Sequence, residues 1–194
     1  MRHHSNSPKK LLVLVAALVA GASFTAPAQS TPLRVVPDVD LNRYAGTWYE
    51  IARLPNRFEE KCAGDITAHY APRPDGRITV TNRCRESNGT TSTAEGVARR
   101  VDGRPPSVLK VRFAPAFLSW LPQVWGDYQI IELGSDYDYA VVGSPNRKYL
   151  WVLGRAPQMD DSLYAQLLAR AAAQGFDTTT MIRVSHRAVE RPPR

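Results

Sequence analysis

Residues Gly46–Arg53 have the sequence GTWYEIAR. Apolar and aromatic side chains dominate the run, which is the composition of a strand packed on a core. It ends at Pro55-Asn56, residue types that interrupt strands and favour turns. The run therefore predicts a β-strand over Thr47–Leu54, and similar runs follow it along the chain.

Seven more short runs, apolar or alternating, extend to residue 155, and turn residues such as Pro72–Gly76 separate them. No helical segment long enough for a crossover lies between them, so parallel βαβ units are excluded. Eight consecutive strands joined by short loops predict an antiparallel sandwich or an up-and-down barrel. The further strands are expected at Asp65–Ala71, Arg77–Cys84, Thr93–Val101, Val108–Ala114, Asp127–Leu133, Tyr139–Gly143 and Tyr149–Arg155.

The periodicity then changes, and Met159–Gly175 is predicted to be the one long helix. Its leucines recur at helical spacing, whereas the runs Tyr139–Val142 and Tyr149–Leu153 are apolar on both faces. We therefore expect the helix to pack on the outer face of those two strands, so that both of their faces are buried. A short strand is expected within Thr180–His186.

The first 28 residues have the pattern of a secretory signal peptide. Three cations and no acid precede the apolar stretch Leu11–Ala20, and the small triplet Ala26-Pro27-Ala28 follows. The apolar stretch is short for a bilayer span, which needs about 20 residues. Cleavage after Ala28 removes the three cations, so the formal net charge falls from +7 to +4. This charge is spread along the chain without a basic block, so we expect no nucleic-acid partner.

A lipid anchor is not expected. Leu18–Gly21 has the small-residue character that precedes the modified cysteine of a bacterial lipoprotein, but the next residue is Ala22. Without a thiol there is nothing to acylate. The sequence predicts a periplasmic or secreted protein that is soluble after cleavage, with residues 29–38 leading into the domain at 39–186 and a disordered tail at 187–194.

Export also bears on the two cysteines, because thiols in an oxidising compartment tend to pair. The turn at Pro72–Gly76 folds the segment between Cys62 and Cys84 into a hairpin, which brings the two close together and sets Tyr70 near Ile78 or Arg77. A disulfide closing such a loop stabilises the fold by about 3 kcal/mol in the chain-entropy description.

Strand alternation indicates which side chains face inward. In Val108–Phe113, for example, three apolar residues share one face and two cations share the other. A closed eight-stranded sheet is either filled by its own side chains or holds one small ligand, and the pattern leaves both open. Any ligand should be apolar. The candidate pocket residues are Ala68, Tyr70, Ile78, Val80, Leu109, Val111, Phe113, Tyr128 and Ile130.

Three motifs resemble signatures of the lipocalin family, in the family's order. They are Gly46-Thr47-Trp48-Tyr49, the looser Tyr137-Asp138-Tyr139, and Arg155 at the end of the last barrel strand. The resemblance is to the bacterial branch and covers about Val39–His186. It implies an all-β fold, an eight-stranded antiparallel up-and-down barrel with one C-terminal α-helix outside and a short ninth strand. It also implies a structural barrel floor built from Gly46, Trp48, Tyr49 and Arg155, with the guanidinium over the indole.

The resemblance implies a carrier of small hydrophobic molecules, fatty acids or lysophospholipids above all, in membrane maintenance or the stress response. The alternative is a lipocalin-fold enzyme. His69 and His186 are the only histidines after residue 28, and no Ser/His/Asp grouping or metal-ligand spacing is visible. We therefore expect no enzyme activity, no cofactor and no metal. The expected partners are a hydrophobic ligand and a transient membrane contact, for a monomer or homodimer.

Two features stay open at this stage. The apolar segment Pro115–Trp125 reads as a lid, a membrane-touching tip or additional core. Glu50 and Arg112 are expected to be solvated or paired outside the barrel, with contact to a ligand head group as the alternative.

Overall fold

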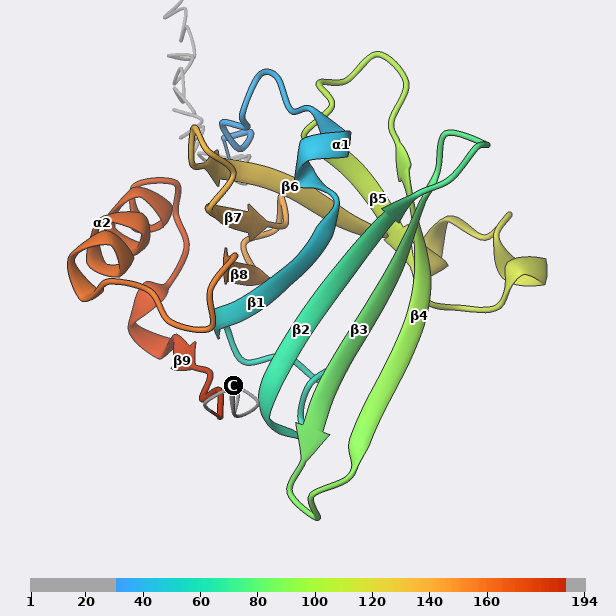
Figure 1. Cartoon of the computed structure of the whole chain (residues 1–194). Helices are drawn as coiled ribbons and strands as arrows, with labels where there is room; N and C mark the ends of the chain where they lie inside the picture. The colour runs from blue at the N-terminus through green and yellow to red at the C-terminus, as the bar shows by residue number, and fades with distance from the viewer. Residues whose placement is uncertain (1–30, 188–194) are drawn as a thin grey trace, which may run out of the picture. The chain divides into compact units, whose positions relative to one another are not determined.

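A computed structural model describes residues 31–187 and shows nine strands in one sheet (Figure 1). The spatial order is β2-β3-β4-β5-β6-β7-β8-β1-β9, and β1 also pairs with β2. The strands are β1 (Gly46–Arg53), β2 (Cys62–Pro72), β3 (Ile78–Glu86), β4 (Thr91–Arg100), β5 (Val108–Arg112), β6 (Gly126–Leu133), β7 (Tyr139–Gly143), β8 (Leu150–Gly154) and β9 (Ile182–Arg183).

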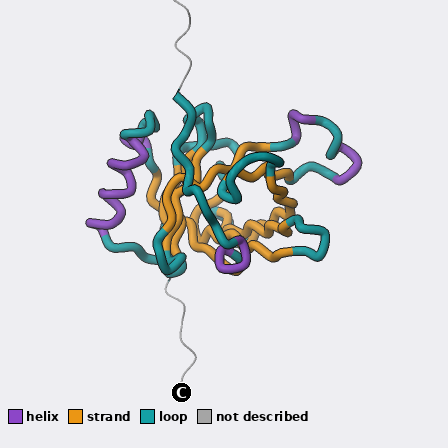
Figure 2. The backbone as a smooth tube through the Cα atoms, turned by 90° about the horizontal axis from the view of Figure 1, so that it is seen from above, coloured by secondary structure: helices purple, strands orange, loops and turns teal. Residues whose placement is uncertain are grey.

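Closure of the sheet depends on β1. Its first half pairs with β2, where Trp48 lies opposite Ala68, and its second half pairs with β8, where Glu50 lies opposite Leu153. All pairings are antiparallel, so eight strands form a closed up-and-down barrel, seen as a ring in Figure 2. The short β9 pairs with β1 outside this closure. The predicted barrel is confirmed.

Alternation along the strands creates two separate apolar cores. The inner core lies inside the barrel and contains Trp48, Leu109 and Ile130. The outer core lies between the barrel wall and the helix α2 (Asp161–Ala172) and contains Val141, Val152 and Leu167. A residue's place in its strand therefore decides which core it joins.

The helix α2 is capped by Asp160, whose carboxylate accepts hydrogen bonds from the amides of Ser162 and Leu163 at 2.9 and 3.1 Å. Two residues of this helix, Leu167 and Ala171, are fully buried against the barrel wall. Strands β7 and β8 are thus covered on both faces, as their double apolar pattern predicted. No helix within residues 31–187 is long and apolar enough to cross a membrane.

Several short helices were not predicted, because one turn leaves no apolar periodicity in a sequence. α1 (Leu41–Tyr44) begins after Asp40, which accepts from the Asn42 amide at 2.8 Å. Three 3₁₀ turns follow later in the chain. They are η1 (Ala116–Leu118), η2 (Pro122–Val124) and η3 (Thr178–Thr180).

The β2–β3 hairpin carries the disulfide. Cys62 and Cys84 are bonded, with their Cα atoms 5.6 Å apart, so the predicted bridge is confirmed. Two register shifts between Cys62 and Thr67 provide the slack. Tyr70 lies opposite Val80 rather than Ile78 or Arg77, because β2 continues to Pro72 before the chain turns.

Both ends of the chain bear on the predicted boundaries. The predicted signal peptide, 1–28, and residues 188–194 of the predicted tail lie outside the described residues. Residues 31–38 of the predicted lead-in are part of the fold, since Leu33 is buried in the outer core and the Val36 amide donates to the Ile130 carbonyl at 3.0 Å. Arg187, assigned to the tail, instead donates to Asp65 through Nε at 2.6 Å.

The register also defines the two ends of the barrel. α1 and the loops after β2, β4 and β6 lie at one end, called here the floor (Figure 1). The loops at residues 54–61, 87–90, 113–125 and 144–149 lie at the other end, called here the mouth.

Candidate ligand-binding site

The floor is closed by an indole beneath a guanidinium. Trp48 is 0% exposed, and its Nε1 donates to the Tyr44 carbonyl at 2.8 Å. The Cζ atom of Arg155 lies 3.9 Å from the centroid of the Trp48 ring. This cation–π contact is worth about 0.5–2 kcal/mol.

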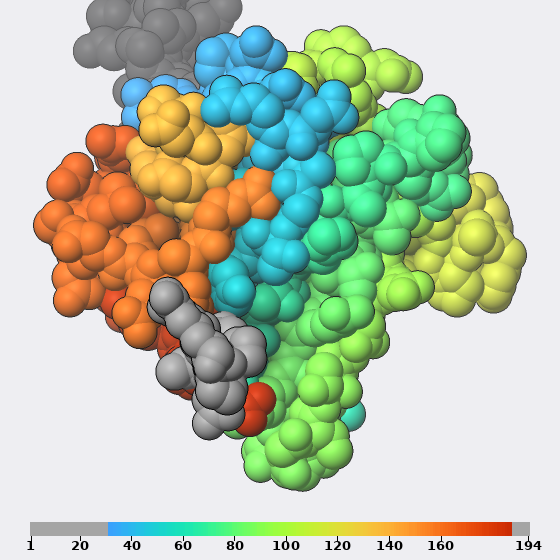
Figure 3. Space-filling model, in the orientation of Figure 1, coloured from blue at the N-terminus to red at the C-terminus, as the bar shows by residue number. Residues whose placement is uncertain are grey.

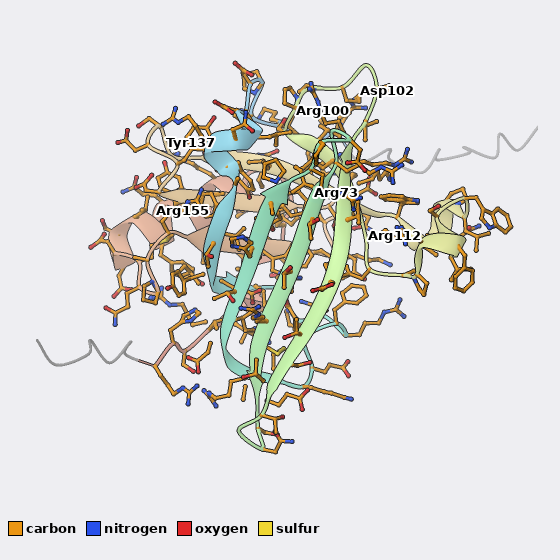
Figure 4. The ribbon with its side chains drawn as sticks, turned by 45° about the vertical axis from the view of Figure 1, so that its right-hand side comes forward. Arg73, Arg100, Asp102, Arg112, Tyr137 and Arg155 are labelled. Carbon is orange, nitrogen blue, oxygen red and sulfur yellow. A yellow bond between two sulfur atoms is a disulfide. The ribbon has the colours of Figure 1, made fainter. Side chains whose placement is uncertain are left out.

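Arg155 is also a hydrogen-bond clamp, and Figure 4 shows it beside Tyr137. Its Nε donates to the Tyr137 carbonyl at 3.2 Å, and Nη1 donates to the Thr47 carbonyl at 2.9 Å. The three motifs of the sequence thus meet at the floor. Gly46 has φ +94°, and a Cβ there would lie 3.3 Å from Nη1 of Arg155, so glycine suits both the turn and the close approach. The remaining acceptors are the carbonyls of Arg43, Tyr44 and Ala45.

Tyr49 does not belong to this floor. It alternates with Trp48, so its side chain packs against the outer core and meets the ring of His186 edge-on, at 5.4 Å between centroids. Grouping Tyr49 with the floor followed the motif rather than the alternation, and the structure corrects it.

A chain of three tyrosine hydroxyls lies above the floor. The Tyr128 hydroxyl is 2.7 Å from that of Tyr44 and 2.9 Å from that of Tyr70. Burial raises the pKa of all three phenols, that of Tyr70 to about 12, so they are neutral at physiological pH. The three hydroxyl groups have three protons but make only two hydrogen bonds with one another. One proton is therefore left to donate to another acceptor.

The predicted pocket residues lie together, except at one end. Five are buried in the inner core, and three are partly exposed against it. Phe113 follows β5 and is 42% exposed, with its ring beside Gly96. Along β5, exposure of the inward-facing side chains increases toward the mouth, from 2% at Leu109 to 42% at Phe113. The buried residues are Tyr70, Ile78, Val80, Leu109 and Ile130, and the partly exposed ones are Ala68, Val111 and Tyr128.

A charged cluster lies toward the mouth. Glu50 is 4% exposed and shares the inward face with Trp48, which corrects the expectation that it lies outside. A bulge after Glu50 also turns Arg53 inward, opposite Trp151. Arg53 contacts Glu50 through Nη1 at 3.2 Å and Glu59 through Nε at 3.0 Å. Burial, then the charge of Glu59, raises the pKa of Glu50 well above its ordinary value.

Aromatic rings accompany this cluster. Tyr149 lies 5.6 Å from Phe58 and stacks on Trp151 at 5.8 Å between centroids. Phe58 is 64% exposed. A pocket of about 400 Å³ opens beside the cluster; it is lined by Arg53, Pro55, Asn56, Arg57, Glu59, Glu60 and Ile182.

Sequence reasoning missed Arg53, Glu59 and the aromatic rings. The alternation of Trp48 and Glu50 on one strand was a readable signal that Glu50 points inward. The bulge that turns Arg53 has no such signal.

Arg112 lies on the outer face of β5, opposite Val97. It is buried rather than solvated, because its guanidinium stacks on Trp125 at 5.3 Å and donates to the Ala114 carbonyl (Figure 4). The segment that follows adds nothing to the core, since Phe117 and Trp120 are each 75% exposed.

Neither histidine faces the barrel interior. His69 lies opposite Thr47, and its Nδ1 is 2.9 Å from the Thr47 hydroxyl. His186 Nε2 donates to the Glu50 carbonyl at 2.8 Å from outside the wall. Among residues 31–187, no group of three or more His, Cys, Asp or Glu side chains could hold a metal ion.

Known proteins share this arrangement. Residues 39–186 match the family described as a Lipocalin-like domain. Temperature-induced lipocalin-1 of Arabidopsis thaliana is 40% identical over 77% of this chain and 80% of the relative. Outer membrane lipoprotein Blc of Escherichia coli strain K12 is 38% identical over 89% of this chain and 96% of the relative. The solved structure of apocrustacyanin C1 is similar in fold, with a TM-score of 0.62 and 16% identity over 84% of this chain and 94% of that one. The chain belongs to the lipocalin family.

Proposed function

We propose that the barrel carries a small hydrophobic ligand, held above the floor and entered from the mouth. The observation behind this proposal is that some inward-facing side chains of the barrel remain exposed. Trp48 is 0% exposed, whereas inward-facing Tyr128 and Trp151 remain partly exposed and Phe113 is 42% exposed. A barrel packed solid with its own side chains would not leave these inward residues accessible.

The ligand class we propose is fatty acids or lysophospholipids, in membrane maintenance. An acyl chain fits the apolar lining of Ala68, Val111 and Leu109. Its polar end would then lie at the mouth, beside Glu50, Arg53 and Glu59, where charged groups already interrupt the apolar wall.

The charges of this cluster favour one head group over another. Two carboxyl groups flank one guanidinium, so the cluster is neutral with Glu50 protonated and negative with Glu50 ionised. A fatty-acid carboxylate gains little there. The ammonium of a zwitterionic lysophospholipid would meet carboxylate oxygens and the aromatic faces of Phe58 and Tyr149. We therefore rank zwitterionic lysophospholipids above fatty acids.

Titration of the delipidated protein tests the pocket and the ranking together. Intrinsic tryptophan fluorescence should change saturably with both lipid classes, and lysophosphatidylethanolamine should bind more tightly than a fatty acid of equal chain length. Ala68→Leu, which fills inward space, should weaken binding about tenfold. Thr93→Leu, on the exposed outer face of β4, is the control. No saturable change with any lipid class would contradict the carrier function.

We also propose that the protein is exported and soluble. Its relative in E. coli is named an outer membrane lipoprotein, whereas this chain has Ala22 after the tetrapeptide Leu18–Gly21. Expression in a Gram-negative host with radiolabelled palmitate tests this. The protein should appear unlabelled in the periplasmic or secreted fraction, and a labelled band in the membrane fraction would contradict the proposal.

A further inference from the structure

The loop between β5 and β6 is an apolar projection, called here the tip (residues 113–125). Its thirteen residues include no charged side chain. Phe117 and Trp120 are each 75% exposed, although large apolar side chains are normally buried. Figure 3 shows the tip, in yellow, standing clear of the barrel wall. The tip therefore presents apolar surface to solvent at a convex site.

Internal bonds hold the tip in one shape. Two 3₁₀ turns, η1 and η2, form it, each preceded or begun by a proline. The indole of Trp125 donates to the Ser119 carbonyl at 2.8 Å and ties the end of the tip to its middle. Because the tip is ordered before it meets any partner, little conformational entropy is lost when Phe117 and Trp120 are buried.

Two arginine side chains lie at the base of the tip. The guanidiniums of Arg99 and Arg112 lie 4.5 and 5.3 Å from the Trp125 ring centroid. Among the described residues, no carboxylate lies within salt-bridge distance of either guanidinium. Lys110, in contrast, is paired with Asp127 at 2.7 Å. Arg112 is buried and Arg99 is exposed, so Arg99 provides the positive charge that an anionic partner can reach at the base.

We propose that the tip docks the protein onto a bilayer containing anionic lipids. Aromatic side chains at the end of the tip would enter the interface between head groups and acyl chains, where Trp and similar residues are favoured. The exposed Arg99 behind them would meet a lipid phosphate, and this charge complementarity favours anionic membranes. The tip lies at the mouth, so docking would bring the barrel opening to the lipid from which a ligand is taken. A convex, uncharged tip suits a fluid bilayer better than a fitted protein pocket.

Vesicle flotation of the purified protein tests the proposal. With vesicles of phosphatidylethanolamine and phosphatidylglycerol, the protein should float with the lipid and release it at high salt. The double variant Phe117→Ser/Trp120→Ser should bind at least about tenfold more weakly, because interfacial binding scales with the buried apolar area. Thr93→Ala, on the exposed outer face of β4, should bind like the wild type.

A second measurement separates docking from folding and from the carrier function. The double variant should keep its urea midpoint and its affinity for a soluble lysophospholipid, since the tip contributes nothing to the core. Brominated lipids should quench the wild type more than Trp120→Phe. Equal vesicle binding by the wild type and the double variant would overturn the proposal. So would a concentration-dependent dimer that the double variant abolishes, in the absence of vesicle binding, because the tip would then be a protein interface.

Discussion

The floor and the mouth of the barrel differ in how completely their side chains are buried and hydrogen-bonded. At the floor, Trp48 is fully buried and one guanidinium, that of Arg155, bonds to five backbone carbonyls. Toward the mouth, the aromatic rings of Phe58 and Phe113 are 64% and 42% exposed. Exposed rings contribute little to the stability of a fold, but a ligand can cover them. The floor therefore provides stability, and the mouth is available for binding.

Removing the floor indole should have the largest effect on stability. Trp48→Ala leaves a cavity beneath Arg155 and deletes the cation–π contact. We expect the free energy of unfolding to fall by about 4 kcal/mol. Urea denaturation monitored by circular dichroism measures it. Trp120→Ala, at the mouth, should change the same quantity by less than about 0.5 kcal/mol. Equal losses in the two variants would break the contrast between floor and mouth.

Loss of the disulfide should have the next largest effect. It joins β2 to β3 on the mouth side of the sheet and constrains the unfolded chain. Cys62→Ser/Cys84→Ser should lower the free energy of unfolding by about 3 kcal/mol. Urea denaturation with and without reductant measures this, since the wild type in reductant should match the double variant. An unchanged midpoint would show that the mouth needs no covalent support.

The third effect is visible as a dependence on pH. Because burial raises the pKa of Glu50, the folded protein keeps a proton that the unfolded chain loses above about 4.5. The free energy of unfolding of the wild type should therefore fall as pH rises above that value. Glu50→Gln cannot ionise, so this part of the slope should disappear. Denaturation curves from pH 4.5 to 8 compare the two proteins, and identical slopes would refute the assignment.

The smallest effect should come from an exposed ion pair. Burial opposes ionisation of Asp65, but hydrogen bonds from Arg187 and Arg85 prevail and lower its pKa from 3.8 to about 2. Asp65→Asn should destabilise by less than about 1 kcal/mol at neutral pH, because solvent screens the pair. Asn also tolerates the positive φ of 53° at this position. The difference from the wild type should shrink as pH falls from 3.8 to 2. A difference that persists at pH 2 would assign the effect to packing.

Prediction from sequence succeeded where a local pattern carries the information. The alternation of Ile78 and Val80, or of Leu109 and Val111, is enough to place them on the inner face. Val141 and Val142 point to opposite faces of β7 and are both apolar, which indicates that both faces of the strand are covered. The thiol pairing followed from a hairpin and an oxidising compartment.

Prediction failed where a single residue changes the register. The bulge after Glu50 brings Arg53 to the inner face beside Glu50, which strict alternation does not allow. Tyr49 was grouped with Trp48 because they are adjacent in a motif, yet adjacent strand residues face opposite ways. The helix α1 has four residues, which is too short to show a helical repeat of apolar residues in the sequence.

Local patterns in the amino-acid sequence determined the positions of the strands, the outer helix and the disulfide. The choice of a barrel over a sandwich and the pairing of Trp48 with Arg155 followed from the motifs that resemble the lipocalin family. The tertiary structure alone decided that Glu50, Arg53 and Glu59 meet inside the mouth and that the tip at 113–125 projects with Phe117 and Trp120 exposed. Both depend on where distant segments lie once the sheet has closed, and no local pattern encodes that closure geometry.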